Sequence, residues 1–477
     1  MLALLAPLPA ALPDAPHSSA EWKIAAYSSA APAEIAAGAT IYDNDGKTVL
    51  RAGTNAWSCT PANPKGPDAD GAYSSAHVAM PFCFDAEGYK WVAGFMTNTA
   101  PVMERDTYMW MLHGDNGEDN TKPLVMSVDD IEDPRNWVQT GPHLMMMPKD
   151  PTSLDSFPTD FSAGAPFVMF KGSKFAHVMI PLNPSGTSGW TEASIPHGLA
   201  HNEAAWKIAA FSSAAPAKIG DHATVMDTDG ATVLRAGTNG WTCMSANMHP
   251  EPAEGWPTAH NAEPLCLDAV GFQWIAGYMA GTPPVMDRDT FVFMLHGDNG
   301  YDNSNPAVRT QADSAPGQWI ESGPHLMLMP KDPATLDAFT DDFHSGDASP
   351  FVMFRGSPFS HLMIPMPGFY DYGAGAAAVA PRMVGEPEAK AAAARGAGPQ
   401  VSQSLYLVRL ASCATRILTS CDLEIHNLLT FYVLTQGPWS SAPSASRWSL
   451  PWWWWSRVAW GPSPSRRRRR RRCSSRS

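Results

Sequence analysis

Histidine and methionine recur two residues apart in three short strings, and each string occurs twice in the chain. The strings are Met-Leu-His-Gly-Asp-Asn-Gly, Gly-Pro-His-Leu-Met and Phe-x-His-x-Met-Ile-Pro. Side chains two residues apart in a β-strand point to the same face of the sheet. Each string therefore predicts a sheet face that carries both His and Met. The histidines concerned are His113, His143 and His177 in the first set and His296, His325 and His361 in the second.

Metal chemistry is the sharpest hypothesis for such a face. Three neutral imidazoles that converge from three strands would hold Zn²⁺ with one open position, which supports hydrolysis or lyase chemistry. Thioether sulfur makes the site softer and favours copper. Asp115 and Asp298, in the His-Gly-Asp-Asn-Gly strings, could orient a ligand imidazole or act as general base. We predict one Zn or Cu per set, and a small molecule or a cation as the partner.

The alternative is that the same face is ordinary core. Methionine commonly fills gaps in protein interiors, and a histidine on an apolar face is often a hydrogen-bonded packing residue. On that hypothesis the protein is a noncatalytic binding or structural module.

The two sets belong to two copies of one domain. Trp22-Lys-Ile-Ala-Ala26 recurs at Trp206-Lys-Ile-Ala-Ala210, and the match continues to Ile180-Pro181 against Ile364-Pro365. A copy of about 165 residues has the size of an independent domain. We predict repeat domains at 18–184 and 204–368, joined by a linker at 185–203 that is rich in Gly, Ser and Pro.

Short elements joined by turns are expected within each copy. Two β-prone runs around Asn44-Asp45-Gly46 predict a hairpin over 40–51. A helix is expected over 85–96, with its start at Asp85. Strands are expected at 107–112, 143–147, 167–170 and 175–180. The fold class predicted from this pattern is α+β, with a mainly antiparallel sheet and a short helix in each domain.

Four of the seven cysteines form matched pairs, Cys59 with Cys83 and Cys243 with Cys266. One disulfide per domain is the leading interpretation, and it favours a secreted protein or an oxidising compartment. Reduced core cysteines and thiolate metal ligands are the alternatives.

The charge of the chain is divided between an acidic body and a basic tail. The net charge of −13 combines residues 1–370, with 18 Lys+Arg and 41 Asp+Glu, and a tail after residue 370 that is net basic. The acidic body repels phosphate backbones, so we expect no nucleic-acid partner for it. No run of 18 uncharged apolar residues predicts a transmembrane segment. Residues 1–17 could be a signal peptide or an Ala/Pro-rich terminus.

The segment 369–477 differs in kind from both copies. It is of low complexity and ends in four consecutive tryptophans and, further on, seven consecutive arginines. The arginine run suits a nuclear-import or nucleic-acid patch; a disordered appendage or a misassigned gene end are the alternatives. We assign this segment no function.

Several strings of the second copy resemble those of an uncharacterised group of exported bacterial proteins. They are Gly-Thr-Asn-Gly-Trp-Thr-Cys-Met (237–244), Pro-Leu-Cys-Leu-Asp (264–268), Gly-Pro-His-Leu-Met (323–327) and Ser-His-Leu-Met-Ile-Pro (360–365). The resemblance covers both copies and none of the tail. It implies an exported ancestor with a single domain, duplicated here, and it implies no activity.

Overall fold

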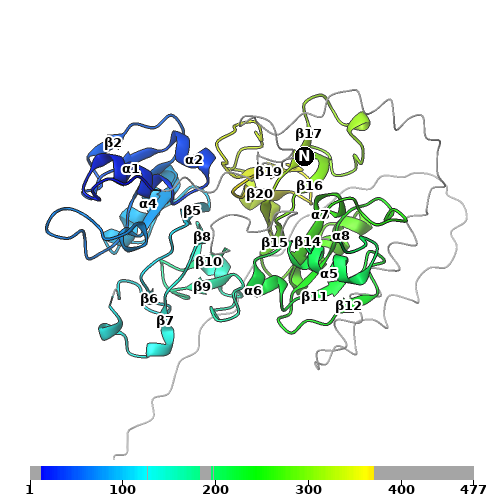
Figure 1. Ribbon diagram of the computed structural model, residues 1–477, viewed down its shortest axis with the longest axis horizontal. Helices are drawn as coiled ribbons and strands as arrows, with labels where there is room; N and C mark the ends of the chain where they lie inside the picture. The colour runs from blue at the N-terminus through cyan, green and yellow to red at the C-terminus, as the bar shows by residue number, and fades with distance from the viewer. Residues whose placement is uncertain (1–11, 126, 183–194, 197, 370–477) are drawn as a thin grey trace, which may run out of the picture. The chain divides into compact units, whose positions relative to one another are not determined.

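The computed structural model describes residues 12–125, 127–182, 195–196 and 198–369 (Figure 1). The predicted tail, apart from residue 369, lies outside the described residues, as do 1–11 of the predicted leader and most of the predicted linker. The two repeats fold alike, each around one mixed sheet with a few short helices, so the predicted α+β class is confirmed.

An eight-stranded sheet forms the centre of each repeat. In the first repeat its order is β2 (Val49–Arg51), β1 (Thr40–Tyr42), β3 (Ser58–Pro61), β4 (Pro81–Phe84), β5 (Thr107–Met111), β8 (His143–Met147), β10 (His177–Pro181) and β9 (Phe167–Met169). In the second repeat the order is β12 (Val233–Arg235), β11 (Thr224–Met226), β13 (Thr242–Ser245), β14 (Pro264–Leu267), β15 (Thr290–Met294), β18 (His325–Met329), β20 (His361–Pro365) and β19 (Phe351–Met353). Neighbouring strands are antiparallel except β1 with β3 and β11 with β13.

Smaller elements complete each repeat. The α-helices of the first repeat are α1 (Ala20–Ser28), α2 (Ala33–Gly38), α3 (Ala76–Ala79) and α4 (Ala86–Met96), and those of the second are α5 (Ala204–Ser212), α6 (Ala217–Gly220), α7 (Ala259–Ala262) and α8 (Ala269–Ala280). The 3₁₀ turns are Val128–Asp130, Pro134–Asn136, Pro151–Leu154, Gln311–Asp313 and Pro333–Leu336. A separate two-stranded ribbon joins β6 (Glu118–Asp119) to β7 (Trp137–Val138), and in the second repeat β16 (Asp298–Asp302) to β17 (Trp319–Ser322).

The helix predicted over 85–96 is present as α4, and one residue explains where it begins. The side chain of Asp85 accepts the backbone N–H of Gly88 at 2.9 Å, which caps the helix. The same carboxylate accepts hydrogen bonds from Arg105 and from Thr107 at the start of β5. Asp268, Arg288 and Thr290 repeat this arrangement in the second copy. The cap therefore also fastens the helix to the central strand.

Two helices cover opposite faces of each sheet. In the first repeat, α1 packs on the face that carries Trp110 and Leu144, and α4 packs on the face that carries Met109 and Met145. Every residue of β5 and β8 is buried. Both faces of the sheet are thus core. The face under α1, which also carries Met146, is therefore buried and not exposed to solvent.

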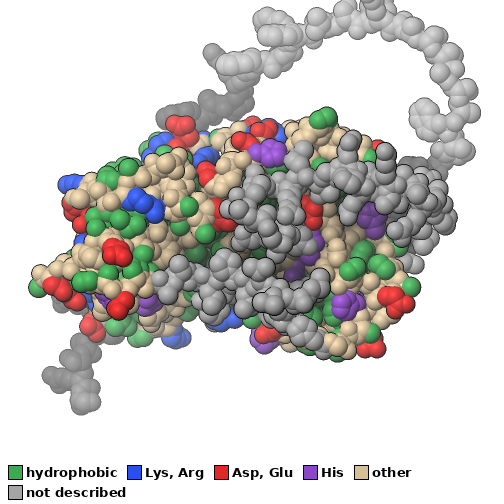
Figure 2. Space-filling view, turned by 45° about the horizontal axis from the view of Figure 1, so that its top comes forward, with side chains coloured by type: hydrophobic (Ala, Val, Ile, Leu, Met, Phe, Trp, Pro, Cys, Tyr) green, Lys and Arg blue, Asp and Glu red, His purple; other side chains and the backbone are tan. Residues whose placement is uncertain are grey.

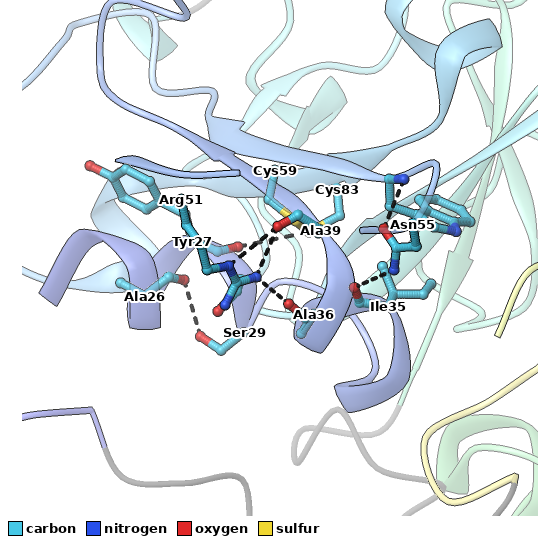
Figure 3. The surroundings of a disulfide bond; sticks show 12 residues. Ala26, Tyr27, Ser29, Ile35, Ala36, Ala39, Arg51, Asn55, Cys59 and Cys83 are labelled. Carbon is cyan, nitrogen blue, oxygen red and sulfur yellow. Dashed lines mark hydrogen bonds between the residues drawn. A yellow bond between two sulfur atoms is a disulfide. The ribbon is translucent and has the colours of Figure 1, made fainter. Parts of the chain in front are cut away.

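Both predicted disulfides are present, and each joins two adjacent strands. Cys59 on β3 pairs with Cys83 on β4, and Cys243 on β13 pairs with Cys266 on β14. Figure 3 shows the first disulfide beside Arg51, which donates hydrogen bonds to the carbonyls of Ala36 and Ala39 at the end of α2. Two disulfides are consistent with an oxidising compartment. Within the described ranges, no helix is long and apolar enough to cross a membrane.

Candidate functional site

His143 shares one face of the first sheet with Met145, as His177 does with Met179, and His325 and His361 repeat this with Met327 and Met363. His113 and His296 lie beyond the ends of β5 and β15 and contact the serines that follow α1 and α5, so they do not join this face. Strand register places Met109, Met145 and Met179 directly beside one another on β5, β8 and β10. Met146 and its counterpart Leu328 belong to the cluster on the other face. We call the face under α4, and its equivalent under α8, the methionine face.

The three histidines of each predicted metal site are not brought together. His143 pairs across the sheet with Pro181, which is four residues along β10 from His177. At about 3.3 Å per residue, this places the two backbones roughly 13 Å apart. His113 follows the end of β5, and its Nε2 lies 2.8 Å from the hydroxyl of Ser29 at the end of α1.

The second repeat repeats this separation. Nε2 of His296 lies 2.7 Å from Ser213 Oγ, and His325 pairs with Pro365 at the far end of β20 from His361. Among the residues that the structure describes, no group of three or more His, Cys, Asp or Glu side chains could hold a metal ion.

His177 and His361 are packing residues on the methionine face. Each has Nδ1 3.0 Å from the backbone carbonyl two residues earlier, at Phe175 and Phe359, so Nδ1 carries the proton and Nε2 the lone pair. The ring of Trp91 packs edge to face against His177, and Trp274 packs in the same way against His361. The ring centroids are 5.5 Å apart in both pairs. Burial lowers the pKa of each histidine to about 4. Both imidazoles are therefore neutral near pH 7.

The predicted catalytic aspartates hold the loop that follows the central strand. Oδ1 of Asp115 accepts the backbone N–H groups of Gly117 and Thr140, each at 3.1 Å, and Oδ2 accepts the Thr140 hydroxyl at 2.7 Å. Oδ1 of Asp298 accepts the N–H groups of Gly300 at 3.1 Å and Ser322 at 3.3 Å. Asp119 and Asp302 bind backbone N–H groups of the next turn in the same way.

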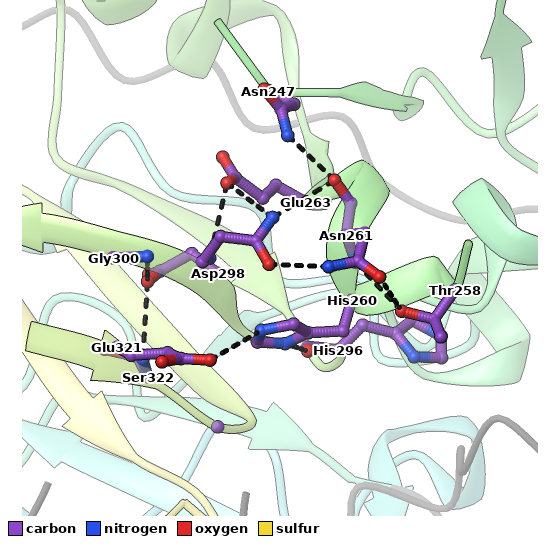
Figure 4. A network of polar contacts seen from close by, with 12 residues as sticks. Asn247, Thr258, His260, Asn261, Glu263, His296, Asp298, Gly300, Glu321 and Ser322 are labelled. Atoms are coloured by element: carbon purple, nitrogen blue, oxygen red, sulfur yellow. Dashed lines mark hydrogen bonds and ion pairs between the residues drawn. The ribbon is translucent and has the colours of Figure 1, made fainter. Parts of the chain in front are cut away.

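Asp298 has a second carboxyl group as neighbour, and sequence reasoning missed it. Glu263 follows α7 with φ of 48°, and its Oε2 accepts the hydroxyl of Tyr301 at 2.9 Å. Oε1 accepts the side-chain amide of Asn299 at 3.0 Å. Figure 4 shows Glu263 and Asp298 in the same polar network. Burial and the charge of Glu263 raise the pKa of Asp298 well above its usual range, and burial raises the pKa of Glu263 as well.

The first repeat supplies its second carboxyl group from another position. Met80 stands where the second repeat has Glu263, and Glu118 stands where it has Tyr301. Burial and the neighbouring Asp115 raise the pKa of Glu118 to about 8. Each repeat thus keeps a carboxyl group beside its aspartate. Comparing identical residues between the copies could not reveal it, because the carboxyl group stands at a different sequence position in each copy.

A cavity of about 120 Å³ opens on the methionine face of the second repeat. Its wall is mainly apolar and includes eight methionines: Met244, Met248, Met279, Met294, Met327, Met329, Met353 and Met363. Leu265, Leu267 and Trp274 contribute further apolar surface, while Asp298, Tyr301 and His361 bring polar groups to the same wall. The methionine face is therefore a cavity lining here as well as core.

Buried nitrogen atoms lie close to this wall. Nδ1 of His325 is 2.8 Å from the carbonyl of Gly323, which leaves the lone pair on Nε2. That Nε2 is buried, makes no hydrogen bond to any described residue, and lies 3.9 Å from Oδ2 of Asp298. Nε2 of His143 is likewise buried without a described partner in the first repeat.

No known protein family, curated protein or solved structure matches the chain. The resemblance to exported bacterial proteins stays a prediction.

Proposed function

We propose that the second repeat is a noncatalytic binding module that takes a small, mainly apolar molecule into the methionine-lined cavity. The observation that carries this proposal is the cavity itself, about 120 Å³ of space against the sheet in an otherwise buried core. Well-packed interiors contain few such spaces, and an apolar cavity of about 150 Å³ accepts benzene. A ligand of about six non-hydrogen atoms fits this size.

Methionine suits a binding wall for chemical reasons. Its side chain is unbranched and polarizable, so it adapts to ligands of different shape. Eight methionines around one small space provide that adaptability. Trp274 and the strands that carry these methionines form the more rigid part of the wall. A module of this kind needs no reacting group, and none of the contacts of Asp115 or Asp298 implies a reaction.

The test uses the full chain with ¹³C-labelled methionine methyl groups and 2-methylpentane as the probe. We expect saturable shifts of methyl signals from the second repeat, such as that of Met327. The double variant Leu265→Phe with Leu267→Phe introduces the residues that the first repeat has, and it should abolish the shifts. Val285→Phe, at a position 86% exposed, is the matched control and should bind like the parent protein. A parent protein without saturable shifts would overturn the proposal.

Copper(I) is a second candidate ligand, favoured by one specific observation. The eight thioethers share their wall with the neutral imidazole of His361, and soft sulfur donors with one imidazole suit Cu(I) better than Zn²⁺. Competition with a chromophoric Cu(I) chelator tests it. Retention of one Cu(I) per chain, lost in Met327→Leu with Met329→Leu, would support copper, whereas complete transfer to the chelator would reject it. No hydrolase or lyase step is proposed.

A further inference from the structure

We infer that the ligand of the second repeat is a small apolar amine whose nitrogen is bound by Asp298. This inference rests on the proposed function and names its ligand class. It is carried by the hydrogen-bonding capacity of the polar groups at the cavity wall.

The hydroxyl groups and the imidazole of that wall have already donated their hydrogens. The Tyr301 hydroxyl donates to Glu263, and the Ser245 hydroxyl donates to the carbonyl of Ala262 at 2.7 Å. His361 donates through Nδ1 to Phe359, which leaves a lone pair on Nε2. The thioethers are weak acceptors. These hydroxyl, imidazole and thioether groups can only accept further hydrogen bonds, as can Asp298 once it has lost its proton, so a ligand that donates hydrogen bonds complements them.

Asp298 offers the strongest of these acceptors. The residue is only 5% exposed, and its Oδ1 is occupied by two backbone N–H groups. Its Oδ2 faces the buried Nε2 of His325 across 3.9 Å, too far for a direct hydrogen bond. Oδ2 is therefore the oxygen of Asp298 that can accept a hydrogen bond from a ligand in the cavity. A charged ammonium donor makes a stronger hydrogen bond to a carboxylate than a neutral hydroxyl group does.

The remainder of the wall suits the body of such an amine. Trp274 and Tyr278 stack with ring centroids 5.3 Å apart, and both line the cavity. In a space of about 120 Å³, a bound molecule that reaches Asp298 also touches apolar and aromatic surface. Aromatic faces attract cations as well as hydrocarbon.

Binding of an ammonium ion next to Asp298 is coupled to the release of one proton. Asp298 is buried beside Glu263, which favours its protonated form in the empty cavity. When the ammonium ion arrives from water, Asp298 loses its Oδ2 proton to solvent and becomes the counter-ion. One proton is therefore released for each amine bound. The other titratable groups of this cluster are Glu263, Tyr301, Glu321, His260 and His325.

The experiment compares 3-methylbutylamine with 2-methylpentane, which carries a methyl group in place of the amine. Calorimetry of the full chain in two buffers of different ionisation enthalpy gives the affinity for the amine and the number of protons released. Methionine methyl signals give the affinity for the hydrocarbon. We expect the amine to bind at least tenfold more tightly, with about one proton released. Asp298→Asn should remove both the preference and the proton release, whereas Glu118→Gln in the first repeat should change neither.

The outcomes separate the inference from the proposed function. If the hydrocarbon binds as tightly as the amine, the inference is overturned and the binding module stands. If the amine binds without proton release, Asp298 is not its counter-ion and the inference fails. If neither molecule binds, both proposals fail. The comparison of the two probes on the parent protein decides the matter even if Asp298→Asn does not fold.

Discussion

The two repeats have the same strands in the same order, yet they differ around the methionine face. The first repeat carries Phe82 and Phe84 on β4, with ring centroids 4.9 Å apart, where the second carries Leu265 and Leu267. These leucines line the cavity of the second repeat. Two smaller side chains on one strand therefore accompany an open space, and the sheet beneath does not change.

The hydrogen bonds of the buried aspartate also differ between the two repeats. In the first repeat, the Thr140 hydroxyl occupies Oδ2 of Asp115. In the second, Ser322 takes the place of Thr140, and only its backbone N–H bonds to the aspartate, at Oδ1. Space and an accessible carboxyl oxygen thus occur together. On our proposal, these two differences together suit the second repeat to a ligand.

Acidic residues lie at many points of the described surface in the view of Figure 2. They accord with the acidic balance of residues 1–370, and they are separate from the buried carboxyl groups that distinguish the two repeats.

The largest expected effect tests what the repeats have in common. Replacing Cys59 and Cys83 by alanine, or Cys243 and Cys266, opens loops with separations of 24 and 23 residues. Loops of this length predict a loss of about 3 kcal/mol of unfolding free energy for the affected repeat. Urea unfolding, assigned to each repeat by hydrogen exchange, measures it. Losses that differ greatly between the two repeats would show that the two disulfides do not stabilise their repeats equally.

Acid should also affect the two repeats alike. His177 and His361 have folded pKa values of about 4 against about 6.5 in an unfolded chain. The unfolded state binds more protons between these values, so stability falls as the pH decreases from 6.5 towards 4. Each histidine should lower the unfolding free energy of its repeat by about 2 kcal/mol between pH 7 and pH 5. His177→Gln and His361→Gln should each reduce this difference, measured by urea unfolding at both pH values. An unchanged pH dependence would show that the histidine is not buried as described.

Much of the fold could be predicted from local patterns. The cap at Asp85, the hairpin around Gly46 and the strand at 143–147 depend on neighbouring residues, and the structure contains all three. The pairing of Cys59 with Cys83 followed from a matched spacing. The face that His143 shares with Met145, and His177 with Met179, followed from the two-residue period of strands.

The site depended on information that no local pattern contains. Register places His143 and His177 at opposite ends of their strands, and only the paired sheet reveals it. The carboxyl group next to Asp298 comes from Glu263, whose counterpart in the first repeat is Met80. The cavity arises from the volumes of side chains on several strands. Distances of this kind are set by tertiary packing.

Exchanging the residues of β4 should make the first repeat resemble the second. Phe82→Leu with Phe84→Leu removes buried aromatic volume and should lower the unfolding free energy of the first repeat by about 1 to 2 kcal/mol. We expect the methionine methyl signals of that repeat, such as that of Met145, to shift when 2-methylpentane is added. A folded variant that shows no such shifts would mean that other residues decide whether a cavity opens.

The smallest expected effect concerns a single methyl group beside Asp298. Ser322→Thr installs the residue of the first repeat, where the Thr140 hydroxyl donates to Oδ2 of the aspartate at 2.7 Å. The new hydroxyl should compete with the amine for Oδ2 of Asp298. It should weaken amine binding three- to tenfold, about 1 kcal/mol, because one hydrogen bond to a charged group is partly replaced. Binding of 2-methylpentane, which makes no hydrogen bond, should stay the same. Equal weakening of both probes would mean that Thr acts by narrowing the cavity, and that the difference between Thr140 and Ser322 does not govern access to the carboxyl group.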